Sequence, residues 1–272
     1  MKLYVLQSGI LKGDKGDYVA GGAGTPFDVP VPYFLIEHES GYVLFDSGHN
    51  EAIIRDPRGT LGDEMVEAFT PVIAKEDFVI HALARLGVKP EEIVYQLCSH
   101  LHFDHCGGIG LFPHAKVVIQ RAELHYAYQP DPFMKSSYLR EDFDKDVDWL
   151  ILDGWQDNKY DLFDDGKIII YYTPGHTPGH QSVLVNLEES PPMMLMADAC
   201  YTMENLDGMK LSGWACDHLA YLKNLMVFKD LQKKGVKMVP GHDPETWPSI
   251  KKAPEFYTPS ISEKQAPYNT FR

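Results

Sequence analysis

The segment SHLHFDHCGG, residues 99–108, constrains this chain more than any other. It holds four side chains that commonly bind metals: His100, His102, Asp104 and His105. On a helix, His100 and His102 would face apart and could not easily share one ion. On an extended segment they point to the same side, and EIVYQLCS (92–99) just before them has the pattern of a strand. We therefore predict an extended segment that carries His100 and His102. The loop after it would turn Asp104 and His105 inward, where Gly107 and Gly108 permit a tight backbone path.

Three other strand-like segments end in the same residue types. These ends carry His176 and His180, then Asp198, then His242 and Asp243. Spacing alone does not decide which histidine of TPGHTPGH binds metal. Imidazole and carboxylate groups suit zinc, and a site without thiolates also admits iron, cobalt or manganese. With one histidine of TPGHTPGH and without Asp243, five histidines and two aspartates remain. They exceed what one tetrahedral ion can use, whereas two ions that share a carboxylate accommodate all seven.

The rest of the chain alternates short apolar runs with helical patterns. Strands are predicted at 2–7, 32–37, 42–48, 92–99, 115–120, 167–175, 182–186, 193–198 and 236–242. Helices are predicted at 75–88 and 217–235, and long loops at 20–32 and 129–166, the latter with one short helix. This pattern is typical of an α/β sandwich. Because no linker divides the sequence, we expect a single domain over 1–272.

Composition restricts the partners of this chain. It has 39 acidic and 25 basic residues, a formal charge of -14, and this charge repels nucleic acid and anionic lipid. No stretch approaches the roughly 20 apolar residues of a membrane span, and the N-terminus lacks the pattern of a signal peptide. Four cysteines without disulfide-type spacing indicate a cytoplasmic location. Cys106 and Cys200 lie beside the predicted ligands, but we expect them to pack in the core.

At its histidine and aspartate motifs the chain resembles the metallo-β-lactamase superfamily. The resemblance runs from VLFDSG to VPGHD and implies an αββα sandwich, two mixed sheets packed face to face with helices outside. It further implies two metal sites joined by one carboxylate. The first would use His100, His102 and His176, the second Asp104, His105 and His242, with Asp198 bridging. By this resemblance His176 is the ligand, and His180 has a supporting or structural role.

Within that superfamily the chain is most similar to the N-acyl-homoserine lactonases, which are quorum-quenching enzymes. The similarity lies in SHLHFDHCGG, TPGHTPGHQS and the pair Asp198 and Tyr201. It implies a carboxylic ester hydrolase (EC 3.1.1 type) with two divalent ions, zinc first, for a small-molecule lactone substrate. A hydroxide bridging the ions would attack the lactone carbonyl, Tyr201 would donate a hydrogen bond to its oxygen, and Asp104 would deliver a proton to the departing alkoxide. A homodimer is a further expectation.

Other functions use a similar site. These are a lactonase for another ring, such as a pyridoxolactone, a glyoxalase-II-like thioesterase, an iron protein of redox chemistry, and a noncatalytic metal-binding module. The C-terminus (251–272) shows no obvious helical platform for glutathione. An aspartate at 198 disfavours the β-lactamases that carry cysteine there, and His102 disfavours flavodiiron proteins, which usually have glutamate. The acidic balance disfavours the RNA-processing nucleases.

Several residues near these motifs have open roles. Asp46 in LFDSG either orients a metal-binding histidine or is a solvated carboxylate. Six further histidines are expected to be solvated or hydrogen-bonded: His38, His49, His81, His114, His125 and His218. An acyl chain would need an apolar groove, for which the candidates are Phe27, Tyr33, Phe103, Phe133 and Met134.

Overall fold

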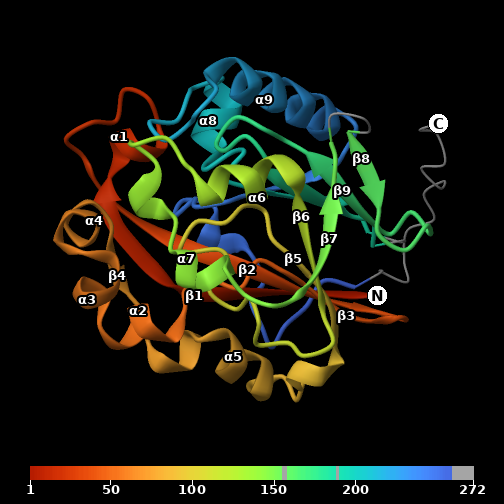
Figure 1. Ribbon diagram of the computed structural model, residues 1–272. Coiled ribbons are helices and arrows are strands. Elements are labelled where there is room, and N and C mark those ends of the chain that lie inside the picture. Colours follow the sequence, from red (N-terminus) through yellow and green to blue (C-terminus); the bar gives the residue numbers. More distant parts are fainter. Residues whose placement is uncertain (155–157, 188–189, 259–272) are drawn as a thin grey trace.

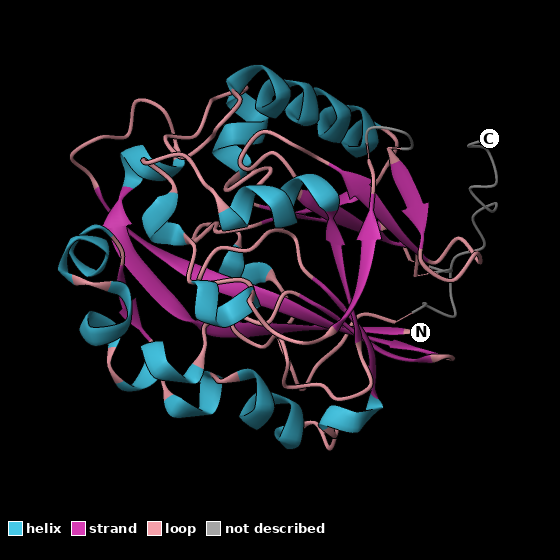
Figure 2. Ribbon diagram, viewed as in Figure 1, coloured by secondary structure: helices cyan, strands magenta, loops and turns pink. Residues whose placement is uncertain are grey.

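Two mixed β-sheets pack face to face, and helices cover the outer side of each (Figure 1). The computed structural model describes residues 1–154, 158–187 and 190–258. In Figure 2 the strands form the middle of the molecule and the helices its periphery. This is the αββα sandwich that the resemblance implied.

The larger sheet has seven strands in the order β4-β1-β2-β3-β5-β6-β7. Their bounds are β1 Lys2–Asp14, β2 Pro26–His38, β3 Gly41–Phe45, β4 Thr70–Val72, β5 Ile93–Leu97, β6 Lys116–Gln120 and β7 Asp148–Leu152. Strands β3, β5, β6 and β7 run parallel to one another. The pairs β4–β1, β1–β2 and β2–β3 are antiparallel. The carboxyl ends of β3 and β5 therefore meet at the same edge.

The smaller sheet has five strands in the order β12-β11-β10-β9-β8. Their bounds are β8 Lys159–Asp161, β9 Ile168–Tyr172, β10 Gln181–Val185, β11 Met193–Ala197 and β12 Lys237–Pro240. Because β11 and β12 are parallel and β10 runs against both β9 and β11, the strands β9, β11 and β12 point the same way. Their carboxyl ends share one edge.

Helices surround these sheets on both sides. Their bounds are α1 Lys15–Tyr18, α2 Glu51–Arg55, α3 Pro57–Leu61, α4 Asp63–Ala68, α5 Val79–Arg85, α6 Arg121–Tyr128, α7 Arg140–Phe143, α8 Met203–Gly208 and α9 His218–Lys233. Short 3₁₀ turns lie at Lys75–Asp77, Pro90–Glu92, Lys135–Ser137 and Trp247–Ser249. In Figure 1, α8 and α9 lie along one outer side and α2 to α5 along the opposite one. Within the described part of the chain, no helix has the length and apolar character needed to cross a membrane.

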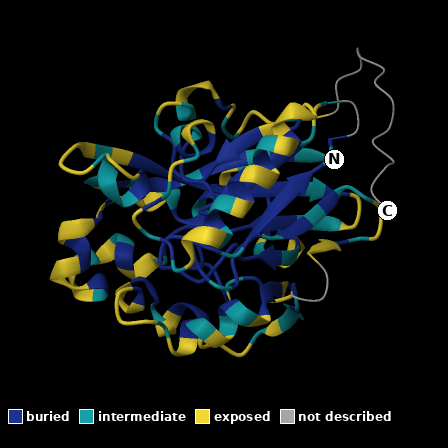
Figure 3. Cartoon of the chain, turned by 90° about the horizontal axis from the view of Figure 1, so that it is seen from above, coloured by how far each residue is buried: buried dark blue, intermediate teal, exposed yellow. Residues whose placement is uncertain are grey.

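Three apolar layers hold the sandwich together. Side chains such as Phe34 and Phe45 from the larger sheet meet Val183 and Leu195 from the smaller one. Leu83 of α5 and its neighbours cover the outer face of the larger sheet, and α8 and α9 cover the smaller sheet. Figure 3 shows buried strands between helices that are exposed on their outer faces. Burial of apolar surface on both faces of both sheets is the main force that stabilises this architecture.

All nine predicted strands are present, but the loop predicted at 20–32 is partly wrong. Strand β2 begins at Pro26 and contains Pro30 and Pro32. Prolines normally argue against a strand because they cannot donate a ladder hydrogen bond. Here β2 pairs with β3 only from Phe34 onward, so its proline-rich half has β1 alone as a neighbour. A missing amide hydrogen is tolerated on such an edge.

The loop predicted at 129–166 is also partly wrong. It contains the expected short helix, α7, but also β7 and β8. Both strands are edge strands, since β7 pairs with β6 and β8 with β9. Edge strands are more exposed and carry a weaker apolar pattern, which explains why β7 and β8 were not predicted from the sequence. Residues 155–157 of this segment lie outside the described residues, as do 259–272 of the C-terminal segment.

Candidate metal centre

The predicted ligands converge at one edge of the sandwich from the carboxyl ends of four strands. The HLHFDH residues follow β5, His176 follows β9, Asp198 follows β11 and His242 follows β12. Strand β5 ends at Leu97, so His100 and His102 lie in the loop after the strand and not on the strand itself. The prediction of an extended segment at these histidines was therefore too long. Their rings nevertheless meet, with centroids 4.4 Å apart.

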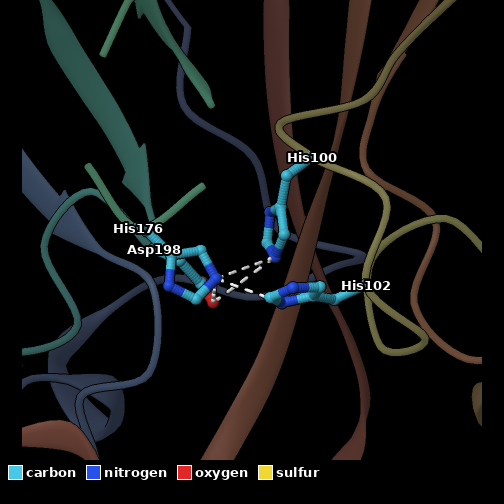
Figure 4. Close-up of side chains that lie close together, drawn as sticks. All are labelled: His100, His102, His176 and Asp198. Atoms are coloured by element: carbon cyan, nitrogen blue, oxygen red, sulfur yellow. Dashed lines mark hydrogen bonds and ion pairs between the residues drawn. The ribbon is translucent and has the colours of Figure 1, made fainter. Parts of the chain in front are cut away.

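Three histidines form the first group of this site (Figure 4). The Nε2 atom of His176 lies 3.2 Å from Nε2 of His100 and 3.1 Å from Nδ1 of His102. Asp198 completes the group, with Oδ2 at 3.3 Å from His176 Nε2 and 3.7 Å from His100 Nε2. All four side chains are buried.

Asp104, His105 and His242 form the second group. The Oδ2 atom of Asp104 lies 3.4 Å from Nε2 of His105 and 3.7 Å from Nε2 of His242. Oδ1 of Asp198 lies 3.3 Å from Nε2 of His105 and 3.2 Å from Nε2 of His242. Asp198 therefore turns one oxygen toward each group, as a bridging carboxylate would.

Hydrogen bonds outside the two groups set the tautomers of these rings. Nδ1 of His176 donates to the carbonyl oxygen of Trp214, and Nδ1 of His242 donates to that of Pro30, both at 2.7 Å. Nδ1 of His105 donates to Oδ2 of Asp46 at 3.0 Å. Since a neutral imidazole carries one proton, the Nε2 atom of each ring presents a lone pair toward the site.

This arrangement fits divalent ions. Lone pairs of His100 and His176 that face each other at 3.2 Å repel unless a cation lies between them. Two ligand nitrogens on a tetrahedral zinc ion are spaced by about 3.4 Å, given Zn–N bonds of about 2.0–2.1 Å. Among the described residues, buried Nε2 of His105 and Oδ1 of Asp198 also lack hydrogen-bond partners. A cation would satisfy both atoms, so the donor set matches a metal centre.

Burial and mutual charge perturb the titration of the site. Burial lowers the pKa of His100 and His102 well below the ordinary histidine value, and neighbouring histidines lower it further. Burial also opposes ionisation of Asp198, but His105, His242 and His176 outweigh it and hold the pKa of Asp198 well below its usual range. Neutral imidazoles at His100 and His102 and an ionised carboxylate at Asp198 are the protonation states that metal ligands need. At His105 and His242 the neighbouring carboxylates outweigh burial and raise the pKa.

Asp46 is buried, which rules out the solvated carboxylate, one of the two roles expected for it from the sequence. Besides His105, it accepts hydrogen bonds from the backbone N–H of Ser99 at 2.7 Å and from the Ser99 hydroxyl at 2.8 Å. That hydroxyl in turn accepts a hydrogen bond from Nδ1 of His100 at 2.9 Å. Asp46 therefore orients His105 directly and His100 through Ser99.

Tyr201 and His180 differ in their relation to the site. The hydroxyl of Tyr201 lies 3.1 Å from Nδ1 of His176, and burial raises the pKa of Tyr201 well above its ordinary value. His180 belongs to neither group of candidate ligands, and its Nδ1 pairs with the hydroxyl of Thr173 at 2.9 Å. Asp243 also points elsewhere, since its carboxylate accepts the backbone N–H of Met203 at 2.9 Å.

The remaining sequence expectations have mixed outcomes. Cys106 and Cys200 are buried in apolar clusters, as expected. Gly107 lies in a turn, and it also permits close packing, because a Cβ atom there would lie 2.2 Å from the backbone nitrogen of Asn50. Tyr33 is wrong as a groove candidate, since it lies on β2 and packs toward α5. Phe103 belongs to the same apolar cluster as Tyr201.

A buried carboxylate that was not predicted from the sequence lies behind the three-histidine group. Glu123, in the first turn of α6, accepts hydrogen bonds from the segments that carry His100, His102 and His176. The structure shows Glu123 and Ala127 one helical turn apart on the buried face of α6, and this burial is not visible in the sequence. A charged residue on the apolar face of a helix points to a specific partner.

Comparison with known proteins gives the family. Residues 26–242 match the model of the Metallo-beta-lactamase superfamily. The chain belongs to this superfamily. Within it, the chain is 39% identical to the N-acyl homoserine lactonase AttM of Rhizobium radiobacter, over 94% of this chain and 98% of that protein. It is 32% identical to the N-acyl homoserine lactonase AiiA of Bacillus thuringiensis subsp. kurstaki, again over 94% and 98%. The chain is a member of this lactonase family of metallo-beta-lactamase proteins.

A solved structure agrees with this placement. An N-acyl homoserine lactone hydrolase, which holds the product N-hexanoyl-L-homoserine at its catalytic metal centre, matches the chain with a TM-score of 0.83. The two are 30% identical, and the match covers 94% of this chain and 98% of the other. The fold of this family member therefore follows that of a lactone hydrolase almost from end to end.

Proposed function

We propose that this chain hydrolyses the lactone ring of N-acyl-homoserine lactones and so acts in quorum quenching. The observation that carries the proposal is the position of Asp198, whose two oxygens face separate groups of ligand atoms. The relatives that match the chain over nearly its whole length are named for the same activity. In the reaction, the hydroxyl group of water joins the carbonyl carbon, the bond from that carbon to the ring oxygen breaks, and the ring oxygen takes the remaining proton of the water.

Seven side chains would hold two divalent ions. One ion would bind His100, His102 and His176 and the other Asp104, His105 and His242, with Asp198 shared between them. When bound, such ions polarise a carbonyl oxygen and lower the pKa of coordinated water toward ~7. Zinc suits these nitrogen and oxygen ligands, although iron, cobalt and manganese accept them too.

Tyr201 would donate a hydrogen bond to the carbonyl oxygen of the lactone. The proton on Nδ1 of His176 is already donated to Trp214, whose carbonyl can only accept. Tyr201 therefore does not need its own proton for His176 and can turn it toward a substrate. Because the phenol keeps this proton, it can stabilise the negative charge that develops on the carbonyl oxygen.

Asp104 would move the proton from the attacking water to the departing ring oxygen. Its Oδ2 atom faces the ring nitrogens of His105 and His242, which leaves Oδ1 for proton transfer. One carboxylate that serves first as base and then as acid suits ester hydrolysis, in which the leaving alkoxide must be protonated.

Finer properties of the protein belong to the same proposal. The four cysteines are unpaired, in keeping with a cytoplasmic location. Both sheets contribute ligands to one site, which suits a single domain. A homodimer is proposed from family likeness, and light scattering of the purified protein would test it.

The decisive experiment measures metal content and then activity on the same preparation. A panel of N-acyl-homoserine lactones of varied acyl length is assayed for ring opening, with S-lactoylglutathione and a pyridoxolactone beside it. We expect two ions per chain and turnover of the homoserine lactones. Inactivity on every homoserine lactone at full metal occupancy would overturn the proposal, and preferential turnover of the thioester would replace it with a thioesterase.

A further inference from the structure

Glu123 joins the two loops that carry the three-histidine group. Its Oε1 atom accepts the backbone N–H of Leu101 at 3.0 Å, and Leu101 stands between His100 and His102 in the chain. Its Oε2 atom accepts the hydroxyl of Thr177, the residue after His176, at 2.5 Å. One carboxylate therefore spans the loop after β5 and the loop after β9.

Two more contacts strengthen this link. Oε2 of Glu123 also accepts the backbone N–H of Gly179 at 3.3 Å, and Oε1 accepts the hydroxyl of Tyr138 at 3.0 Å. The ring of Tyr138 packs edge-on against His102, with centroids 4.6 Å apart. Both oxygens of the carboxylate thus have two donors each. Leu101, Thr177 and Tyr138 each adjoin or contact a histidine of the first group, and Gly179 lies in the same loop as His176.

The backbone is shaped to let Glu123 approach. A Cβ atom on Gly179 would lie 2.0 Å from the backbone nitrogen of Glu123, so glycine is required for this contact. The Glu123 side chain is completely buried. A buried carboxylate needs this many donors to be tolerated, and in return it fixes their positions.

We propose that Glu123 is a positioning residue for the metal held by His100, His102 and His176. It holds the two loops at the separation that brings His176 Nε2 within 3.1–3.2 Å of the other two histidines. Over the residues that the structure describes, its hydrogen bonds go to Leu101, Tyr138, Thr177 and Gly179 and not to Asp104, His105 or His242. His105 and His242 are instead held by Asp46 and by a backbone carbonyl. Its effect is therefore confined to one of the two ions. This inference rests on the proposed metal ligands.

The test uses chains that retain one metal site each. His242→Ala leaves the three-histidine site, and His102→Ala leaves the site of Asp104 and His105. Glu123→Gln is added to each background, because glutamine has nearly the same shape but places an NH₂ group against obligate N–H donors. Affinity for Co²⁺ is measured by titration of its visible absorption, and metal content is measured after dialysis.

We expect Glu123→Gln to weaken Co²⁺ binding about 10- to 100-fold in the His242→Ala chain and less than about threefold in the His102→Ala chain. Equal weakening in both backgrounds would show general destabilisation and overturn the inference, as would no weakening in either. If Glu123→Gln prevents folding, Thr177→Val removes a single donor and should weaken the same site alone. If neither the wild-type chain nor the variants bind Co²⁺, the proposed function is overturned as well. If the wild type binds two ions but Glu123→Gln weakens both sites equally, only this inference is overturned.

Discussion

Oδ2 of Asp46 accepts a hydrogen bond from Nδ1 of His105 at 3.0 Å, and both side chains are buried. Asp46 follows β3 directly and has a φ of +57°, in the left-handed region that non-glycine residues rarely adopt. Such a backbone conformation costs roughly 1–2 kcal/mol and persists where surrounding contacts compensate for it. Here it aims the carboxylate at His105 and at Ser99.

Asp46→Asn should weaken metal binding about 10- to 100-fold, because the Asn amide would direct its own N–H groups at donors. Asparagine tolerates the left-handed backbone well, so the fold should persist. Metal content after dialysis, with circular dichroism as a check on folding, measures the effect. Asp146→Asn, which changes an exposed carboxylate, is the control. Full retention of both ions by the Asp46 variant would show that this hydrogen bond does not support the metal centre.

Tyr201→Phe should lower kcat/KM on N-acyl-homoserine lactones by about 10²- to 10³-fold, or roughly 2.7–4 kcal/mol of transition-state stabilisation. The loss should fall mainly on kcat, since the hydrogen bond strengthens as charge develops on the carbonyl oxygen. Metal content should not change, because His176 keeps its hydrogen bond to Trp214. Steady-state kinetics on preparations with equal metal content provide the measurement. Unchanged rates would remove Tyr201 from the mechanism.

Much of the fold was predictable because its strands have strong apolar patterns. The central strands β3 and β5 are mostly buried and β11 is wholly buried, so all three appear as short apolar runs. The edge strands β7 and β8 were not predicted because one side of an edge strand faces solvent. The proline-rich start of β2 was not predicted because prolines argue against a strand. Only the structure shows that this part of β2 pairs with β1 alone, where a missing N–H is tolerated.

The ligands were predictable for a different reason. Metal-binding residues follow strand ends and cluster in sequence, so HLHFDH and TPGH were visible without a structure. The residues that hold them were less visible. Glu123 reaches the site from a helix. Trp214 and Pro30 contribute only backbone carbonyls, and the identity of a side chain does not predict what its backbone carbonyl accepts. Such contacts depend on tertiary packing, which local sequence does not encode.

His176 and His180 should respond differently to substitution, although TPGHTPGH presents them alike. His176→Gln should lose one of the two ions, since Nε2 of His176 faces both other histidines of its group. His180→Gln should keep both ions and lose about 1–2 kcal/mol of stability, because it gives up its hydrogen bond to Thr173. Metal analysis together with urea unfolding separates the two effects. Loss of an ion in the His180 variant would reverse the assignment.

Asp142→Asn should stabilise the protein at neutral pH but not at acid pH. Burial raises the pKa of Asp142 to about 6, even though Asn50 donates a hydrogen bond to its Oδ1 at 2.6 Å. The ordinary value is 3.8, so between pH 4 and 6 the folded state binds more protons than the unfolded state. Wild-type stability therefore falls as the pH rises through this window, by about 3 kcal/mol at most. Asparagine cannot ionise and avoids this loss. Urea unfolding from pH 4 to 7.5 measures the difference in unfolding free energy between variant and wild type. This difference should grow from pH 4 to 6 and stay constant above pH 6. A difference that does not change with pH would refute the raised pKa.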